Sequence, residues 1–396
     1  MQLVAYGAQD IYLTGNPQIT FIKVVYRRHT NFSMESIEQT INGSVGASSR
    51  VTSTISRNGD LVYRLYYELA GTHTVVKTDG GTANKSPGDL GAALFSEVEV
   101  EVGGQRIDRQ TGQWMNVWSL LTQKNDTRII ATTAGASGTL FQELTGMGGC
   151  VQTTGNNDNT DDVDIAFKYS VPLQFWFCRN PGLALPLIAL QYHEVKIVTT
   201  FSDKAGPLGA AGGSAKLWAD YIYLDTDERR RFAQVSHEYL IEQVQFQAGA
   251  GGTTSTELNF NHPVKELIWT QGQTNGVLTE LENSKYQLKL NGHDRFAARP
   301  RKYFTKQQVW MHHTGPGGLD TTGTANAVGQ GTNTIAVYSF ALKPEEHQPS
   351  GTCNFSRIDN AQLTQLSGTA ASRDVFAVNY NVLRIMSGMG GLAYSN

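Results

Sequence analysis

The sequence predicts an all-β protein with a few short helices, organised as two domains in tandem. A chain of 396 residues and 43.3 kDa suits two cores of ordinary size better than one. Glycine (41 residues) far outnumbers proline (11), and β-branched and aromatic residues alternate with polar ones, as is typical of short strands joined by tight turns. Charged residues make up only 17% of the chain, which suggests a surface partly covered by neighbouring subunits.

Four segments show the period-two alternation of a strand with one buried face. Glu97–Val102 places three valines on one face and three glutamates on the other, and Tyr286–Leu290 and Phe376–Val382 repeat the pattern. The longest segment is predicted to place five side chains on a single face: Leu61, Tyr63, Leu65, Tyr67 and Leu69.

Helix signals are few, the better ones being Trp114–Leu121 and Lys302–Met311, which are both short and aromatic. Between the strands lie long loops rich in Gly, Thr, Asn and Asp: Thr78–Gly91, Thr133–Asp164, Lys204–Ser214, Gln247–Thr256 and Thr314–Thr334. Loops of this length usually form functional surfaces or mobile segments.

An internal repeat becomes visible when the order of elements is compared instead of residue identity. Glu97–Trp118 and Tyr286–Met311 both run from a strand through a glycine turn with Asp and Arg into an aromatic helix. Asp220–Leu224 and Asn379–Leu383 then share the pattern [Asp/Asn]-Tyr-x-x-Leu. Two matches in the same order predict tandem homologous β domains, with the charged stretch Asp225–Arg231 as the joint.

Composition also excludes several functions. A net charge of −3 argues against a protein that mainly coats nucleic acid, because phosphate neutralisation needs an excess of Lys and Arg. The longest apolar stretch, Gly182–Leu190, is too short to span a bilayer, and Met1–Tyr6 does not resemble a signal peptide, so we expect a cytosolic product. We expect free, largely buried thiols at three widely spaced cysteines: Cys150, Cys178 and Cys353.

No catalytic, cofactor or metal site is predicted, because each candidate motif fails at a required position. Lys85-Ser86 lacks the glycines of a phosphate loop, and His193-Glu194 and His237-Glu238 lack the second histidine of a zincin. His312 and His313 are adjacent, a poor spacing for metal ligands. Three further candidates fail: the aspartates 158, 161, 162 and 164 do not form an EF-hand, Gly388–Ala393 has no following helix to hold a dinucleotide, and no nucleophile elbow occurs.

Five asparagines occupy N-x-[S/T] sequons, and most of these matches are expected to be coincidental. Asn84 lies in a glycine-rich loop and is the one that we expect to be well exposed. It is the single candidate glycan acceptor.

Several long phrases of the sequence are distinctive: Gly7–Gln18, Val25–Phe32, Pro181–Val195, Ser350–Asn360 and Tyr380–Tyr394. Together they closely resemble the major capsid protein of large nucleocytoplasmic DNA viruses, nearest to those that infect algae. The resemblance runs from the first residues to the last. It implies a double jelly roll, that is, two tandem eight-stranded antiparallel sandwiches, with three copies forming a pseudo-hexagonal capsomer of an icosahedral shell.

The resemblance also implies a division of the chain and a set of partners. Residues 1–26 would form an inner arm, residues 27–225 the first jelly roll, and residues 226–396 the second with its C-terminal tail. The partners would be further copies of the chain, neighbouring capsomers, and minor capsid and penton proteins. The inner face would lie near an internal viral membrane, without direct sequence-specific binding of nucleic acid. The protein would be made in the host cytoplasm and located in the virion.

Two other classes remain as alternatives. A β-sandwich carbohydrate-binding protein or glycosidase would need exposed aromatic platforms or a carboxylate pair in a cleft, and such pairs leave no linear signature. A cupin metalloenzyme would need His-x-His on a strand, and none of the nine histidines is so spaced. At the C-terminus, Arg384–Asn396 mixes apolar residues with glycine, so we expect a docked tail instead of a mobile one.

Overall fold

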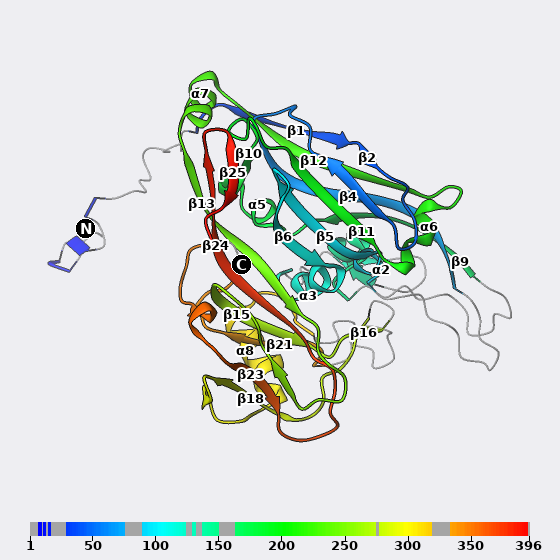
Figure 1. Ribbon diagram of the computed structural model, residues 1–396, viewed down its shortest axis with the longest axis vertical. Coiled ribbons are helices and arrows are strands. Elements are labelled where there is room, and N and C mark those ends of the chain that lie inside the picture. The colour runs from blue at the N-terminus through cyan, green and yellow to red at the C-terminus, as the bar shows by residue number, and fades with distance from the viewer. Residues whose placement is uncertain are drawn as a thin grey trace, which may run out of the picture.

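The computed structural model describes residues 7–9, 11–12, 15–16, 29–75, 89–123, 129–131, 137–149, 163–274, 277–318 and 333–394. Within them the chain forms two β-sandwiches that lie one above the other in Figure 1. Residues 1–26, the expected inner arm, lie largely outside the described ranges. No described helix is long and apolar enough to cross a membrane.

The first sandwich consists of two antiparallel sheets. Sheet 1a contains β1 (Phe32–Gln39), β12 (Ser214–Leu224), β4 (Leu61–Val75), β9 (Val163–Pro172) and β10 (Leu185–Pro186). Sheet 1b contains β2 (Ile41–Asn42), β3 (Arg50–Thr54), β11 (Val195–Phe201), β5 (Phe95–Val102) and β6 (Gln105–Thr111). The core between them includes Val98, Val100 and Val102, as the alternation of that segment predicts.

The second sandwich repeats this plan. Sheet 2a contains β13 (His237–Gln247), β24 (Asp374–Met386), β15 (Pro263–Thr270), β21 (Ala336–Ser339), β22 (Cys353–Asn354) and β25 (Met389–Leu392). Sheet 2b contains β14 (Ser255–Glu257), β23 (Ala361–Gln365), β18 (Lys285–Leu290), β19 (His293–Asp294) and β20 (Arg299–Pro300). Trp269, Tyr286 and Phe304 lie in its core, which is separate from the first.

The same strand order occurs in both sandwiches. In sheet 1a the order is β1, β12, β4, with β9 and β10 both on β4; in sheet 2a it is β13, β24, β15, with β21 and β22 both on β15. The second sheets run β3, β11, β5, β6 and β14, β23, β18, β19. The prediction of an all-β fold built from two tandem antiparallel sandwiches is therefore confirmed.

Short helices occupy the connections. Both predicted aromatic helices are present, as α3 (Gly112–Thr122) and as a π-helical turn η3 (Tyr303–Gln307) that continues into α8 (Gln308–His312). The others are α2 (Leu90–Ala93), α4 (Leu140–Thr145), α5 (Trp176–Arg179), α6 (Gly206–Gly209) and α7 (Thr226–Gln234), with 3-10 turns η1 (Pro181–Leu183), η2 (Asp203–Ala205) and η4 (Phe355–Arg357). Two short hairpins, β7 (Ile129–Ala131) with β8 (Ser137–Thr139) and β16 (Gln273–Thr274) with β17 (Val277–Leu278), complete the described elements.

A β-bulge in β4 corrects one sequence prediction. Asp220 pairs with Arg64 but the next residue, Tyr221, pairs with Val62, so Tyr63 is an extra residue in the strand. Because a bulge reverses the alternation of side chains, Leu61 and Tyr63 pack with Phe232 of α7 on the outer face of sheet 1a. The expected single face is wrong for these two residues, whereas Leu65, Tyr67 and Leu69 do line the core.

The second sandwich has a bulge at the matching place, and the two bulges fix which residues correspond. Val264 pairs with Asn379 and Glu266 with Val378, so Lys265 is the extra residue of β15. By this register Asp220 corresponds to Val378, one residue away from the match suggested by the sequence. Tyr221 accordingly lies in the first core, whereas the ring of Tyr380 lies 5.5 Å from the Lys265 ammonium, outside the second core. A shift of one residue in a strand exchanges the two faces, which explains the difference.

Candidate functional site: the interface between the two sandwiches

Helix α3 belongs to the first sandwich but lies against the second. The Thr111 hydroxyl caps its N-terminus by accepting a hydrogen bond from the Trp114 N–H at 3.1 Å. Its residues from Gly112 to Leu121 are all buried, as expected for a helix that is covered on every side. The sequence folds here as a short helix because both the sandwich behind it and the sheet in front of it supply apolar contacts.

Aromatic side chains make the contact between α3 and sheet 2a. The ring of Trp114 lies 5.3 Å from that of Phe376 in β24 and 5.4 Å from that of Trp118. Val117, Leu120 and Leu121 of the helix share this cluster with residues of the outer face of sheet 2a: Val244, Ile268, Val337, Phe376 and Val378. Each fully buried large side chain contributes about 1.5–3 kcal/mol, so this cluster holds the two sandwiches together firmly.

The second sandwich also caps the C-terminal end of α3. The carbonyls of Leu121 and Leu120 accept hydrogen bonds from the N–H groups of Gly315 (2.7 Å) and Gly317 (2.8 Å), and Thr122 O accepts one from the Thr314 hydroxyl at 3.1 Å. A Cβ atom at Gly315 would lie 2.4 Å from Leu120 O, so the close approach requires glycine there. Helix carbonyls that would otherwise lack a partner are thus satisfied across the interface.

A buried group of charges lies beside this cluster. Glu242 of β13 forms ion pairs with Lys265 at 2.8 Å and with Arg179 of the first sandwich at 3.1 Å, and Arg179 also donates a hydrogen bond to it. His347 lies 3.7 Å away. Burial alone would raise the pKa of the Glu242 carboxyl, but His347, Lys265 and Arg179 lower it to about 2. The guanidinium of Arg179 also stacks over the Trp118 ring at 4.3 Å. The carboxylate therefore stays ionised and binds the two sandwiches together.

His313, at the end of α8, lies between two carboxylates. Its Nε2 is 2.9 Å from Glu266 and its Nδ1 is 3.0 Å from Glu345. Burial would lower the pKa of the imidazole, but the two carboxylates outweigh burial and raise it to about 9. The ring meets Trp118 of α3 edge-on at 6.4 Å, so this charged group also lies at the interface.

The edge strands of the two sandwiches meet as well. Asp108 of β6 accepts a hydrogen bond from the Val244 N–H of β13 at 3.1 Å, and Gln243 donates to Ile107 O. Burial raises the pKa of Asp108 to about 6, although the Val244 and Gln110 hydrogen bonds oppose the rise. These contacts satisfy one backbone N–H on the edge of sheet 2a and one backbone carbonyl on the edge of sheet 1b, groups that would otherwise be open to another strand.

The C-terminal segment returns to the first sandwich. β25 pairs with β24, and Tyr192 N–H donates to Gly388 O at 3.0 Å. The imidazole of His193 lies 3.0 Å from Gly390 O, and a Cβ at Gly390 would lie 2.6 Å from Leu190. The tail is docked, as predicted, and it adds a second connection between the sandwiches.

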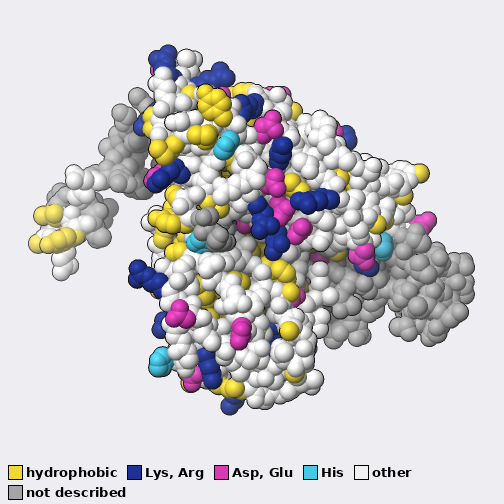
Figure 2. Space-filling view, viewed as in Figure 1, with side chains coloured by type: hydrophobic (Ala, Val, Ile, Leu, Met, Phe, Trp, Pro, Cys, Tyr) yellow, Lys and Arg dark blue, Asp and Glu magenta, His cyan; other side chains and the backbone are white. Residues whose placement is uncertain are grey.

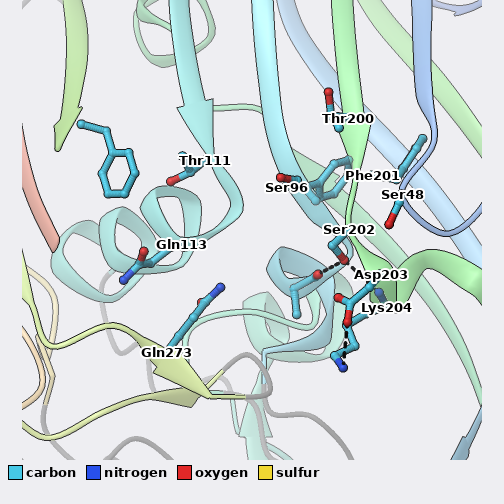
Figure 3. Close-up of a pocket in the computed structure, with 13 residues that line it drawn as sticks. Ser48, Ser96, Thr111, Gln113, Thr200, Phe201, Ser202, Asp203, Lys204 and Gln273 are labelled. Carbon is cyan, nitrogen blue, oxygen red and sulfur yellow. Dashed lines mark hydrogen bonds and ion pairs between the residues drawn. The ribbon is translucent and has the colours of Figure 1, made fainter. Parts of the chain in front are cut away.

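A hollow of about 570 Å³ is lined by residues of both sandwiches (Figure 3). Gln113 of α3 and Gln273 of β16 lie on one side of it, and Ser202, Asp203 and Lys204 on the other. Asp203 is the one carboxylate among its lining residues, and it forms an ion pair with Lys204 at 3.3 Å. Among the described residues, the lining thus holds no pair of carboxylates of the kind that a glycosidase needs.

The structure gives other roles to the residues that sequence motifs singled out. His193 and His237 bind backbone carbonyls, of Gly390 and Phe232 respectively, and His313 pairs with carboxylates. Cys178 and Cys353 are free thiols. Asn84, Cys150 and three of the four clustered aspartates lie outside the described residues. Among the residues that the structure describes, no group of three His, Cys, Asp or Glu side chains is placed to hold a metal ion.

Sequence reasoning considered His313 only as a metal ligand, and it missed the other charged residues at the interface: Arg179, Glu242, Lys265 and Glu266. One signal was available, because Lys265 and Glu266 are adjacent charges inside the otherwise apolar segment Pro263–Trp269. Charges in a strand buried on both faces must be paired.

On the surface, Figure 2 shows charged side chains of both signs interspersed over the visible face of the molecule.

The chain thus consists of two β-sandwiches with the same strand order, joined by buried aromatic and charged contacts, as suits a structural subunit. Comparison with protein families agrees, since residues 20–225 match the family "Major capsid protein N-terminus" and residues 228–391 match "Large eukaryotic DNA virus major capsid protein". The chain belongs to the major capsid protein family of large eukaryotic DNA viruses.

Known relatives cover the whole chain. It is 53% identical over 418 residues to the major capsid protein of Pyramimonas orientalis virus and 40% identical over 476 residues to that of Paramecium bursaria Chlorella virus 1, in each case covering 100% of this chain and 99% of the relative. A quasi-atomic model of the PBCV-1 virus capsid superposes with a TM-score of 0.74 at 36% identity, covering 95% of this chain and 100% of that one. The Faustovirus major capsid protein, at 14% identity and a TM-score of 0.63, shares the fold. The chain is a capsid protein and not an enzyme, and the alternative of a carbohydrate-binding protein or glycosidase is not supported.

Proposed function

We propose that three copies of this chain associate into a pseudo-hexagonal capsomer, and that such capsomers tile an icosahedral shell. The observation that carries the proposal is the repeated strand order, because one chain then presents two similar units side by side. Three such chains supply six similar units, and head-to-tail contacts between them close into a ring when the rotation between neighbours permits it. The firm interface between the sandwiches supports the proposal, since a capsomer needs the two units in a fixed relation.

We assign three parts to the chain: an inner arm of residues 1–26, a first jelly roll of residues 27–225 and a second of residues 226–396 with the C-terminal tail. Helix α7 supports the boundary, because it begins at Thr226, directly after the last strand of the first sandwich, and none of its residues is buried. The two family matches, which end at 225 and begin at 228, are consistent with it.

The remaining partners follow from the position of such a subunit in a shell. Its neighbours would be adjacent capsomers and minor capsid and penton proteins, with an internal viral membrane beneath its inner face. The protein would be made in the host cytoplasm and incorporated in the virion, without sequence-specific binding of nucleic acid. Asn84 is proposed as a glycan acceptor.

Light scattering of the purified chain tests the assembly. We expect a stable particle of about 130 kDa, three times the mass of the chain. Negative-stain images should show hexagonal outlines. A chain that stays monomeric at every concentration, or a ring with another number of subunits, would contradict the proposal.

A further inference from the structure

The interface within the chain joins two kinds of surface. The first sandwich contributes β6 and the helix that follows it, α3, while the second contributes the edge and the outer face of sheet 2a. Because the sandwiches are repeats, each surface has a counterpart on the other sandwich. The counterparts are β19, β20 and the helix η3–α8 on the second sandwich, and sheet 1a on the first.

The matching bulges identify the residues of sheet 1a that correspond to the docking site of α3. Phe376 pairs with Ile268, which pairs with Val337; Trp218 pairs with Tyr66, which pairs with Pro172. Counted from the bulges, these two sets occupy the same positions. We call the second set the aromatic face: Trp218, Tyr66 and Pro172.

The two equivalent faces differ in what covers them. In sheet 2a all three positions are buried beneath α3. In the aromatic face all three positions are partly exposed. The neighbouring edge strands differ in the same way, since the middle of β13 is buried while nearly all of β1 is exposed. Among the described residues, no strand pairs with the outer edge of β1.

The counterpart of α3 is exposed too. Trp310 of α8 has 82% of its surface accessible and Met311 53%, whereas Trp114 and Met115 of α3 are fully buried. Leu342, 77% exposed, lies beside them, because its carbonyl is 3.3 Å from the Nδ1 of His312. We call Trp310, Met311 and Leu342 the α8 patch. Tryptophan is costly to leave in water and is enriched at the centres of protein interfaces.

The turn before the helix shows the same contrast. Counted by strand pairing from the two glycine turns, Asp108 lies opposite Val100 of β5, and the N–H of Arg295 donates to the carbonyl of Leu288, the residue of β18 that corresponds to Val100. Asp108 is buried and binds the edge of sheet 2a, whereas Arg295 is exposed. Each element that makes the contact inside the chain therefore has an uncovered equivalent on the opposite sandwich.

We propose that the α8 patch of one copy docks on the aromatic face of a second copy, in the way that α3 docks on sheet 2a within one chain. The proposal rests on the self-assembly proposed above and names the surfaces that carry it. The contact is heterologous, so each copy uses its α8 patch once and its aromatic face once. A closed ring of three copies leaves neither surface exposed.

Two single substitutions test the contact. Trp310→Asp removes the α8 patch at an exposed position where folding is unaffected, and Tyr66→Arg places a charge in the aromatic face. We expect each to reduce the trimer fraction at least tenfold at a concentration where the unaltered chain is fully trimeric, measured by light scattering. Circular dichroism shows whether each variant is folded. If Tyr66→Arg does not fold, the trimer fraction of Trp310→Asp alone tests the proposed contact. The matched control is Leu144→Asp, at an apolar position of α4 that is 52% exposed and should leave assembly unchanged.

Mixing the two variants gives a sharper result. Trp310→Asp retains an intact aromatic face and Tyr66→Arg an intact α8 patch, so a mixture has one productive contact and should form a complex of two chains that does not close into a ring. If Trp310→Asp forms trimers as readily as the unaltered chain, the surfaces are assigned wrongly while the trimer itself stands. If the mixture stays monomeric although both variants are folded, the heterologous pairing is wrong. If the unaltered chain never associates, both proposals fail.

Discussion

Helix α3 and the helix η3–α8 occupy the same place in the two sandwiches, yet they are built in different ways. α3 is regular, capped by the Thr111 hydroxyl and buried throughout. η3–α8 contains a π-helical turn, has no side-chain cap, and exposes Trp310. The comparison shows that position in the fold sets where a helix forms, while the surface that covers it sets which residues it carries.

The largest loss of stability should come from removing the aromatic contact of the buried helix α3. Trp114→Ala deletes a buried indole between α3 and Phe376, and substitutions of this kind cost about 3–5 kcal/mol. Trp310→Ala, the equivalent change on the exposed helix, should alter the stability of the isolated chain by less than about 0.5 kcal/mol. Chemical denaturation of both variants under conditions that dissociate the assembly measures the difference. Equal losses would mean that the two helices are not distinguished by burial.

The next largest loss of stability should come from breaking the buried charge group around Glu242. Glu242→Ala leaves Lys265, whose side chain is 0% exposed, without its carboxylate, and breaking a buried pair in this way costs about 3–5 kcal/mol. The control is Glu238→Ala, four residues earlier in the same strand. Glu238 pairs with Arg384 at 2.8 Å on the exposed surface, where such pairs contribute about 0–1 kcal/mol. If the two substitutions destabilise the chain equally, the Glu242 group does not hold the sandwiches together.

The sequence predicted the elements well and the packing between them poorly. Alternation identified four of the longer strands, and the aromatic stretches indicated the two helices, because these are local signals. The bulge at Tyr63 has no such signal, so the predicted face of Leu61 was wrong. The inward position of Tyr221 and the outward position of Tyr380 depend on where each bulge falls. The pairing of Glu242 with Arg179, 63 residues earlier, depends on how the sandwiches meet, which no local pattern records.

Removing the C-terminal tail should reduce stability by a smaller amount. It tests the connection made by the tail separately from the connection made by α3. Deleting Ser387–Asn396 removes β25 and the contact of the partly buried Leu392 with the first core, which is worth up to about 1.5 kcal/mol before the entropy of ordering the tail is counted. We expect a lower melting temperature and a lower yield of trimer. Gly390→Val is a narrower test, because its side chain would clash with Leu190 and Val102 without shortening the chain. A truncated protein that melts and assembles like the full chain would show that the α3 interface alone sets the stability.

The smallest effect concerns pH and distinguishes the two ionic contacts of the interface. The pKa of His313 is raised from 6.5 to about 9 in the folded chain, so its contribution to stability is complete below pH 6.5 and is lost as the pH rises towards 9. Glu242 behaves in the opposite sense: its pKa is lowered from 4.5 to about 2, so its contribution is complete above pH 4.5 and is lost only in acid. His313→Gln can still donate a hydrogen bond to a neighbouring carboxylate through its amide NH2 group but cannot titrate. Melting temperatures from pH 6.5 to 9 should fall for the unaltered chain and stay nearly level for this variant, which should already be less stable at pH 6.5. The same fall in both proteins would assign the pH dependence to groups outside the interface.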